Sequence, residues 1–256
     1  MKLLTATALT IGMLVGFGLF DGRGGQPAFA TPSFLQTEQV DPELNLLAAE
    51  RIIIGVDFAL DAVGHAIANA GNARVAHEQM RDTAKKLPGV RAIIALGPDG
   101  YLKHDSYQFP AQELDLSDRS YFRAAKGTSE LVIGSTVIGR TSGTVFLPLA
   151  KRVGELTLVA IVNPHSLFAD QSECDLCLSV LLGNNSDVVA TYPPSVEVPI
   201  GVLSLPLQNR ALGGAESGML LNAPVRVAWK RSVLYPFISL TVFGDPSKAS
   251  LGVDDR

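Results

Sequence analysis

Two neighbouring stretches decide the fold: Leu116-Ser-Asp-Arg-Ser-Tyr-Phe-Arg-Ala-Ala125 and Leu131-Val-Ile-Gly-Ser-Thr-Val-Ile-Gly-Arg-Thr-Ser-Gly143. The first combines charged, aromatic and alanine residues at a spacing that predicts a short amphipathic helix. The second is rich in valine and isoleucine and is interrupted by glycine, which is typical of strands joined by a turn. The chain therefore passes from a short helix into paired strands at this point.

This order of helix and strands resembles the distal module of double Cache domains, the extracytoplasmic ligand-binding regions of bacterial histidine kinases, diguanylate cyclases and chemoreceptors. The resemblance covers about residues 41–245. It implies an α+β fold in which a long N-terminal helix is followed by two PAS-like (Cache) modules, each with a mainly antiparallel sheet of about five strands. It also implies that the chain binds a small molecule and is not an enzyme.

Strand and turn patterns on both sides of the motif agree with this fold. Gly97-Pro98-Asp99-Gly100 predicts a hairpin turn inside Val90–His104, because Pro presets φ and Gly tolerates a positive φ. Apolar runs then predict antiparallel strands at 131–138, 144–152 and 156–162. The same order returns more faintly, with strands expected at 178–182, 188–192, 217–221, 225–231 and 237–243.

An amphipathic helical segment, residues 41–88, precedes the first strand. Asp41-Pro42 supplies an N-cap followed by Pro at the first helical position, and Leu87-Pro88-Gly89 ends the segment. A single helix of this length would extend for roughly 70 Å. We therefore expect the segment to bend, or to divide into two helices, at Gly55, Gly64 or Gly71.

The N-terminus has the pattern of an export signal. Lys2 precedes an apolar run from Leu3 to Phe20, and Ala28-Phe29-Ala30 matches the small-x-small pattern of a signal-peptidase site. We expect removal of residues 1–30 and a periplasmic or secreted protein. The alternative is an inner-membrane anchor formed by residues 3–20, because a spanning helix needs about 20 apolar residues. The expected parts that follow are a linker (31–40), the helical spine (41–88), the distal module (89–172), the proximal module (173–246) and a tail (247–256).

Composition narrows the classes of function. The formal net charge is −4 and no cluster of Lys and Arg occurs, so a nucleic-acid partner is not expected. Hydrophobic residues make up 47% of the chain, which is ample for a packed core. The sequence contains no phosphate-binding loop, dinucleotide fingerprint, nucleophile elbow or zinc-protease motif. We therefore expect no cofactor and no enzyme activity, with an exported hydrolase of unfamiliar type as the weakest alternative.

The predicted short helix carries the first candidate ligand-binding residues, Arg119, Tyr121 and Phe122. The resemblance implies that this helix lines the distal pocket. A guanidinium pairs with a carboxylate through two hydrogen bonds, and a neighbouring ring adds an apolar wall, so a small organic anion is expected. The amino-acid-binding Cache pattern has Tyr five residues before the Arg, where this chain has Leu114, so amino acids are less favoured. In the alternative interpretation, Tyr121 and Phe122 are core residues and Arg119 pairs with Asp118 at the surface.

Three further candidates come from the sheet: Ser135 on the third strand, and His104 and Tyr107 on or just after the second. Each is expected to reach the same concave surface as Arg119. Because successive side chains of a strand face opposite sides, at most one of Lys103 and His104 points inward.

Cys174 and Cys177 form a Cys-x-x-Cys pair at the junction of the modules, and they are the only cysteines of the chain. Leu178 follows the pair where attachment of c-type haem requires His, and two thiols alone are too few for a zinc site. In an oxidising compartment we expect a disulfide between them, with a redox-active pair as the alternative.

The full receptors that the chain resembles continue through a second membrane span into an output domain, whereas this sequence ends at Arg256. We therefore expect a sensing protein without its own output domain, which passes its state to a membrane-bound signalling partner. The alternatives are the remnant of a truncated receptor, and a ligand-free interaction module that dimerises through the long helix.

Overall fold

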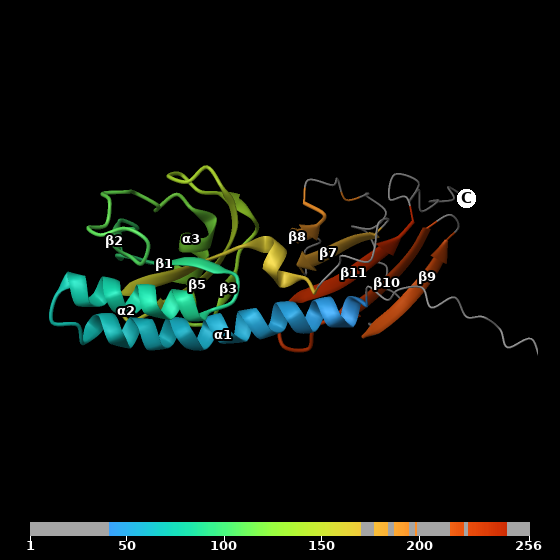
Figure 1. The fold of residues 1–256 in the computed structure, drawn as a ribbon, viewed down its shortest axis with the longest axis horizontal. Helices are drawn as coiled ribbons and strands as arrows, with labels where there is room; N and C mark the ends of the chain where they lie inside the picture. Colours follow the sequence, from blue (N-terminus) through green and yellow to red (C-terminus); the bar gives the residue numbers. More distant parts are fainter. Residues whose placement is uncertain are drawn as a thin grey trace, which may run out of the picture. The chain divides into compact units, whose positions relative to one another are not determined.

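The computed structural model describes residues 41–169, 177–183, 187–194, 198, 216–222 and 225–244. In them, two helices precede two antiparallel sheets (Figure 1). The predicted α+β fold with two sheet-containing modules is therefore confirmed. The predicted signal peptide, the linker and the tail lie outside the described residues. Among the described helices, none is both long and apolar enough to cross a lipid bilayer.

The predicted helical segment consists of two helices, α1 (Pro42–Ala68) and α2 (Ala73–Lys86). Asp41 caps α1, because its carboxylate accepts a hydrogen bond of 2.8 Å from a backbone N–H of the first turn. Asn72 caps α2 in the same way, with hydrogen bonds of 3.0 and 3.1 Å. The segment thus divides beside Gly71, and α2 lies against α1 (Figure 1).

The first sheet has helices on both faces. Its elements are β1 (Val90–Leu96), β2 (Leu102–Asp105), α3 (Ser120–Lys126), β3 (Val132–Ile133), β4 (Val137–Ile138), β5 (Val145–Val153) and β6 (Leu156–Val162), followed by a 3₁₀ helix (Pro164–Leu167). The strand order is β2-β1-β6-β5-β3, and β4 also pairs with β5. On β1, Ile93 packs in the cluster of α1 and α2, whereas the next residue, Ile94, packs in the cluster of α3. Because neighbouring residues of a strand face opposite sides, α3 covers the face opposite to α1.

The apolar run 131–138, predicted as one strand, forms two short strands because of Pro148 on β5. The Pro148 carbonyl accepts a hydrogen bond of 3.0 Å from the Gly134 N–H. Because the nitrogen and the carbonyl of one residue point to the same neighbour in an antiparallel pair, the nitrogen of Pro148 also faces this run. Proline has no N–H to donate in return, and the ladder is interrupted there. Residues 134–136 then lie opposite only residues 147 and 148 of β5, which makes a β-bulge.

The second sheet repeats the topology of the first. Its strands are β7 (Cys177–Gly183), β8 (Val188–Tyr192), β9 (Ser217–Asn222), β10 (Val225–Arg231) and β11 (Phe237–Phe243), in the order β8-β7-β11-β10-β9. If β3 and β4 are counted as one strand and the five strands of each sheet are numbered along the chain, both sheets have the spatial order 2-1-5-4-3. The faint repeat of the sequence is therefore a structural repeat.

α1 packs against both sheets. Ile53 and Leu60 of α1 are buried in one apolar cluster with Leu149 of β5, Leu181 of β7 and Phe237 of β11. Polar contacts accompany this packing, because the Asn45 amide of α1 donates a hydrogen bond of 3.1 Å to a β7 hydroxyl. The helix is thus a shared element of the two modules.

An ion pair joins β5 to α1. The Lys151 ammonium lies 2.8 Å from the Asp57 carboxylate and 2.7 Å from the Asp61 carboxylate. Burial lowers the pKa of Lys151, but the hydrogen bonds and negative charges of the two carboxylates outweigh burial and raise the pKa above its ordinary value of 10.5. Lys151 therefore stays protonated and holds the strand to the helix.

Replacing the lysine tests this link. We expect Lys151→Met to lower the free energy of unfolding by about 1–2 kcal/mol, between the values typical of exposed and of buried ion pairs. Since folding raises the pKa of Lys151, this contribution is fully present below the ordinary value of 10.5 and is lost as the pH rises through the raised value. Urea denaturation at neutral pH measures the loss, with Lys85→Met on the exposed side of α2 as the control. Equal unfolding free energies for the two variants would show that the ion pair contributes nothing.

Candidate functional site

α3 places its two aromatic residues in the core. Tyr121 and Phe122 are each only 2% exposed and lie in one cluster with Phe146 of β5. The rings of Tyr121 and Phe146 meet edge to face, with centroids 6.4 Å apart. Before the helix, the Asp115 carboxylate accepts a hydrogen bond of 2.9 Å from the Ser117 N–H and stabilises a turn that precedes α3. The packing of the two rings fixes the position of the helix on the sheet.

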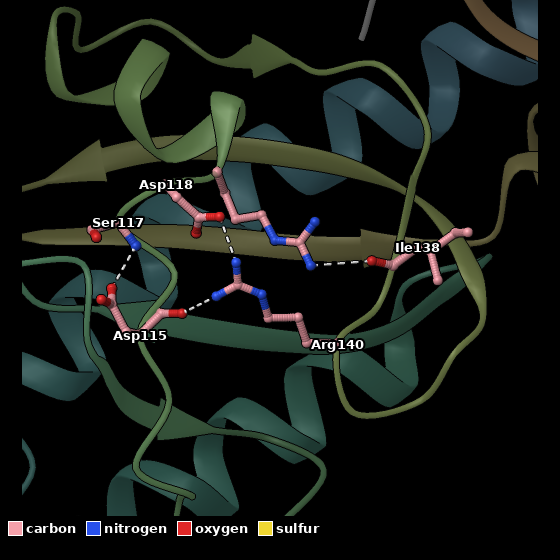
Figure 2. Close-up of polar contacts among 6 residues, drawn as sticks. Asp115, Ser117, Asp118, Ile138 and Arg140 are labelled. Carbon is pink, nitrogen blue, oxygen red and sulfur yellow. Dashed lines mark hydrogen bonds and ion pairs between the residues drawn. The ribbon is translucent and has the colours of Figure 1, made fainter.

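Two arginines hold the β4–β5 hairpin to the start of α3. The Arg140 guanidinium pairs with the Asp118 carboxylate and donates to the Asp115 carbonyl (Figure 2). The Arg119 guanidinium donates a hydrogen bond of 3.2 Å to the Ile138 carbonyl at the end of β4. In the described structure Asp118 thus pairs with Arg140 rather than with Arg119, unlike in the alternative interpretation of the sequence.

Arg119 keeps one hydrogen-bond donor unused. Its Nε atom is buried, and among the described residues it has no hydrogen-bond partner. A buried donor without a partner costs about 1–3 kcal/mol, and more when the group is charged. An anion at this position would supply both the missing acceptor and the opposite charge. The chemistry of this position therefore favours a negatively charged ligand.

The phenol of Tyr121 lies in the electric field of both guanidinium groups. Burial raises the pKa of Tyr121 above its ordinary value of 10.0, and the positive charges of Arg119 and Arg140 partly oppose this effect. Tyr121 is therefore neutral at physiological pH, and its O–H remains a hydrogen-bond donor. Arg119, Tyr121 and Arg140 together form a candidate anion site, which we call the α3 site.

The other residues proposed for the pocket have different surroundings. The Ser135 hydroxyl donates to the Asp187 carboxylate, 3.4 Å away, which lies just before β8 of the second sheet. His104 is half-buried and lines a separate cleft at the edge strand β2, and burial lowers its pKa. Tyr107 follows β2 and is 85% exposed. The α3 site as defined above contains none of these three residues.

Of the two cysteines, one lies within the described residues. Cys177 is the first residue of β7 and is buried, whereas Cys174 lies outside the described residues. The disulfide therefore stays a prediction. Within the described part of the chain, no group of three His, Cys, Asp or Glu side chains is arranged to hold a metal ion.

Arg140 is the residue of the α3 site that sequence reasoning missed. It begins Arg140-Thr-Ser-Gly143, which predicts a turn but does not indicate a partner. Asp118 lies 22 positions earlier in the chain, so their contact depends on how the hairpin folds over the start of α3. The only local signal is a charged side chain in a turn beside an apolar strand.

No family model matches the chain, and no curated protein matches it. Solved structures do match its fold. The extracellular domain of rpHK1S-Z16, described as a histidine kinase, is 24% identical with a TM-score of 0.66, and the match covers 86% of this chain and 99% of that domain. The ligand-binding domain of the Campylobacter jejuni chemoreceptor Tlp3, in complex with 4-methylisoleucine, is 11% identical with a TM-score of 0.54, and the match covers 78% of this chain and 86% of that one.

A third match is the ligand-binding domain of the Pseudomonas fluorescens chemoreceptor CtaA, in complex with L-isoleucine. It is 10% identical with a TM-score of 0.55, and the match covers 81% of this chain and 91% of that one. The chain thus has the fold of the extracellular sensor domains of histidine kinases and chemoreceptors. The predicted double Cache architecture is confirmed.

The arrangement of the α3 site can be tested without a ligand. Because the positive charge of Arg119 opposes the effect of burial on Tyr121, Arg119→Ala should raise the pKa of Tyr121 further above 10.0. Absorbance titration of the phenols measures this pKa, with Tyr121→Phe in each background to identify the Tyr121 signal. Arg123→Ala, on the exposed side of α3, is the control. A Tyr121 pKa that moves equally little in both arginine variants would contradict the geometry.

Proposed function

We propose that this chain is an extracytoplasmic sensor domain that binds a small organic anion at the α3 site. The main support for this proposal is that the buried Nε of Arg119 lacks a hydrogen-bond partner among the described residues. A bound carboxylate would accept from this donor, and Tyr121 adds a further O–H donor nearby. Because Asp118 offsets the charge of Arg140, the unpaired positive charge of the site is that of Arg119. The fold supports the proposal, because its structural neighbours are ligand-binding domains of receptors.

Within the anions, we favour a carboxylate that lacks an amino group. The neighbours Tlp3 and CtaA are in complex with amino acids, so a carboxylate is the chemistry that both kinds of ligand share. An amino acid also needs an acidic partner for its ammonium group, and the carboxylate next to Arg119, that of Asp118, is already paired with Arg140. Leu114 packs against the apolar α3 cluster, where a Tyr of the amino-acid-binding pattern would add a hydroxyl.

The same proposal includes the location and the partner of the protein. We infer cleavage of a signal peptide after Ala30, a disulfide between Cys174 and Cys177, and a signalling partner in the membrane. The support is that the structural neighbours are extracellular domains of receptors rather than enzymes. A sensor domain of this kind would act through binding and pass its state to that partner.

Ligand titration of variants tests the α3 site. We expect Arg119→Ala to weaken binding of 3-methylbutanoate by about 2–5 kcal/mol, the usual cost of truncating a buried charge pair. This corresponds to about a thirtyfold or greater loss of affinity. Tyr121→Phe should cost less, about 0.5–1.5 kcal/mol for one hydrogen bond. Isothermal titration calorimetry measures both effects, with Arg123→Ala as the matched control.

The choice of ligand separates the two carboxylate classes. L-Valine has the same side chain as 3-methylbutanoate together with an ammonium group. Tighter binding of L-valine would replace the carboxylate proposal with an amino-acid site. Equal affinity of wild type and Arg119→Ala for every carboxylate that binds would place the ligand elsewhere in the fold.

A second candidate function, self-association, is favoured by an exposed apolar row on α1. Leu44, Leu47 and Phe58 are 51%, 54% and 73% exposed, and Ile54 is half-buried. These positions recur at spacings of three, seven and four, which is the a/d pattern of paired helices. The polar Arg51 completes the row and favours a protein partner over lipid. We infer that two copies of the chain dimerise through α1, because a self-complementary row of this kind suits a two-fold interface.

A charge placed in this row should prevent the dimer. We expect wild type to sediment as a dimer at micromolar concentration and Phe58→Glu to sediment as a monomer, since a carboxylate in an apolar helix seam is strongly unfavourable. Val75→Glu, an exposed apolar residue of α2 outside the row, is the control. Analytical ultracentrifugation makes the measurement. A monomeric wild type, or a dimer that survives Phe58→Glu, would exclude this interface.

A further inference from the structure

A second cleft lies at the edge of the first sheet, where the beginning of α2, strand β2 and the connection after β2 meet. Its volume is about 560 Å³, and the residues that matter for its chemistry are His77, Tyr101, His104, Asp105, Phe109 and Glu113. Small-molecule sites commonly have volumes of about 300–1,000 Å³. The cleft contains no residue of the α3 site, so it is a separate place for a ligand.

The aromatic wall of the cleft is held in place. The His77 ring lies with Nδ1 2.7 Å from the Asp105 carbonyl. A carbonyl only accepts, so Nδ1 carries the proton in this contact. The Phe109 ring contacts two side chains of α2, with its centroid 5.4 Å from that of His77 and 4.6 Å from the Arg74 guanidinium carbon. The wall is therefore preformed before any ligand binds.

The hydrogen bonds of β2 limit the kind of ligand. Leu102 N–H donates at 2.9 Å to the Leu114 carbonyl, and the Asp105 carbonyl is taken by His77. At each end of the outer edge of β2, a backbone group is thus already hydrogen-bonded. An extended peptide that adds a strand to a sheet needs free groups along that edge. The cleft is therefore suited to a small molecule rather than to a peptide strand.

The charges of the cleft are unbalanced. Lys103 lies 3.5 Å from Asp99, so these two opposite charges offset each other. In the described part of the chain neither Asp105 nor Glu113 has an ion-pair partner. Burial raises the pKa of Asp105, while backbone hydrogen bonds and the nearby His77 oppose this effect. The Arg74 guanidinium over the Phe109 ring is a further positive charge beside the cleft. Burial also lowers the pKa of His104, so this ring is neutral at pH 7 and does not offset the two carboxylates.

We propose that this cleft binds a small organic cation of the alkylammonium class. The carboxylates of Asp105 and Glu113 supply the opposite charge, and the ring of Tyr101 supplies an aromatic face for the cation. The Phe109 ring, which already has the Arg74 guanidinium over it, forms an apolar wall. An organic cation fits better than a metal ion, because within the described residues no three suitable ligands are grouped together. The site goes beyond the proposed anion site, since it differs from it in position and in the sign of the ligand charge.

Calorimetric titration of the full chain with n-butylammonium tests the proposal, with uncharged n-butanol as the ligand control. We expect saturable binding of n-butylammonium and none of n-butanol. Asp105→Asn keeps the side-chain oxygen that accepts from the Tyr107 N–H but removes the charge, so it should weaken binding by about tenfold or more. The exposed Glu113→Gln should weaken it by about two- to fivefold. Asp82→Asn, an exposed carboxylate of α2 outside the cleft, should leave the affinity unchanged.

The experiments can contradict the anion site and the cation site independently of each other. Arg119→Ala should leave binding of n-butylammonium unchanged, whatever it does to carboxylates. Absence of saturable n-butylammonium binding, or the same affinity in wild type, Asp105→Asn and Glu113→Gln, would overturn the cation site. Equal binding of n-butanol would also overturn it, because the cleft would then recognise only the alkyl chain. If Asp105→Asn fails to fold, Glu113→Gln decides the outcome, since its side chain is exposed.

Discussion

The burial of α1 against both sheets is the contact on which the rest of the structure depends. Ile53 and Leu60 lie in one cluster with Leu149 of the first sheet and Leu181 of the second. Burying one such side chain stabilises a protein by about 1.5–3 kcal/mol, whereas the net stability of a whole domain is about 5–15 kcal/mol. A few residues of one helix therefore contribute a large share of the stability, and neither sheet has a complete apolar core without them.

Strand β5 connects this helix to the α3 site. At one end it pairs with β4, whose Ile138 carbonyl accepts from Arg119. At the other end Lys151 pairs with α1, and the helix approaches β5 so closely that a Cβ at Gly64 would lie 2.5 Å from Val153. Arg119 is therefore connected, through β4 and β5, to α1, the element that also packs on the second sheet.

The sequence predicted the parts of the fold that depend on neighbouring residues. The cap at Asp41 and the turn at Gly97-Pro98-Asp99-Gly100 are local, and both form as expected. The division of the apolar run 131–138 was missed, because it depends on Pro148 being its partner across the sheet. The contact of Arg140 with Asp118 was missed for the same reason, since it joins residues that only the folded hairpin brings together. Non-local pairing, rather than propensity, separates what the sequence shows from what it does not.

The two proposed sites follow one physical rule. The fold keeps a donor of Arg119 buried without a partner, and it keeps the Asp105 carboxylate partly buried with no ion pair among the described residues. Each arrangement costs free energy, because burial removes water from a charge that the protein does not neutralise. Groups of this kind are expected at functional sites, where a ligand of opposite charge offsets the cost on binding. Since the two groups carry opposite charges, no single simple ion satisfies both, and the two proposed sites would recognise ligands of opposite charge.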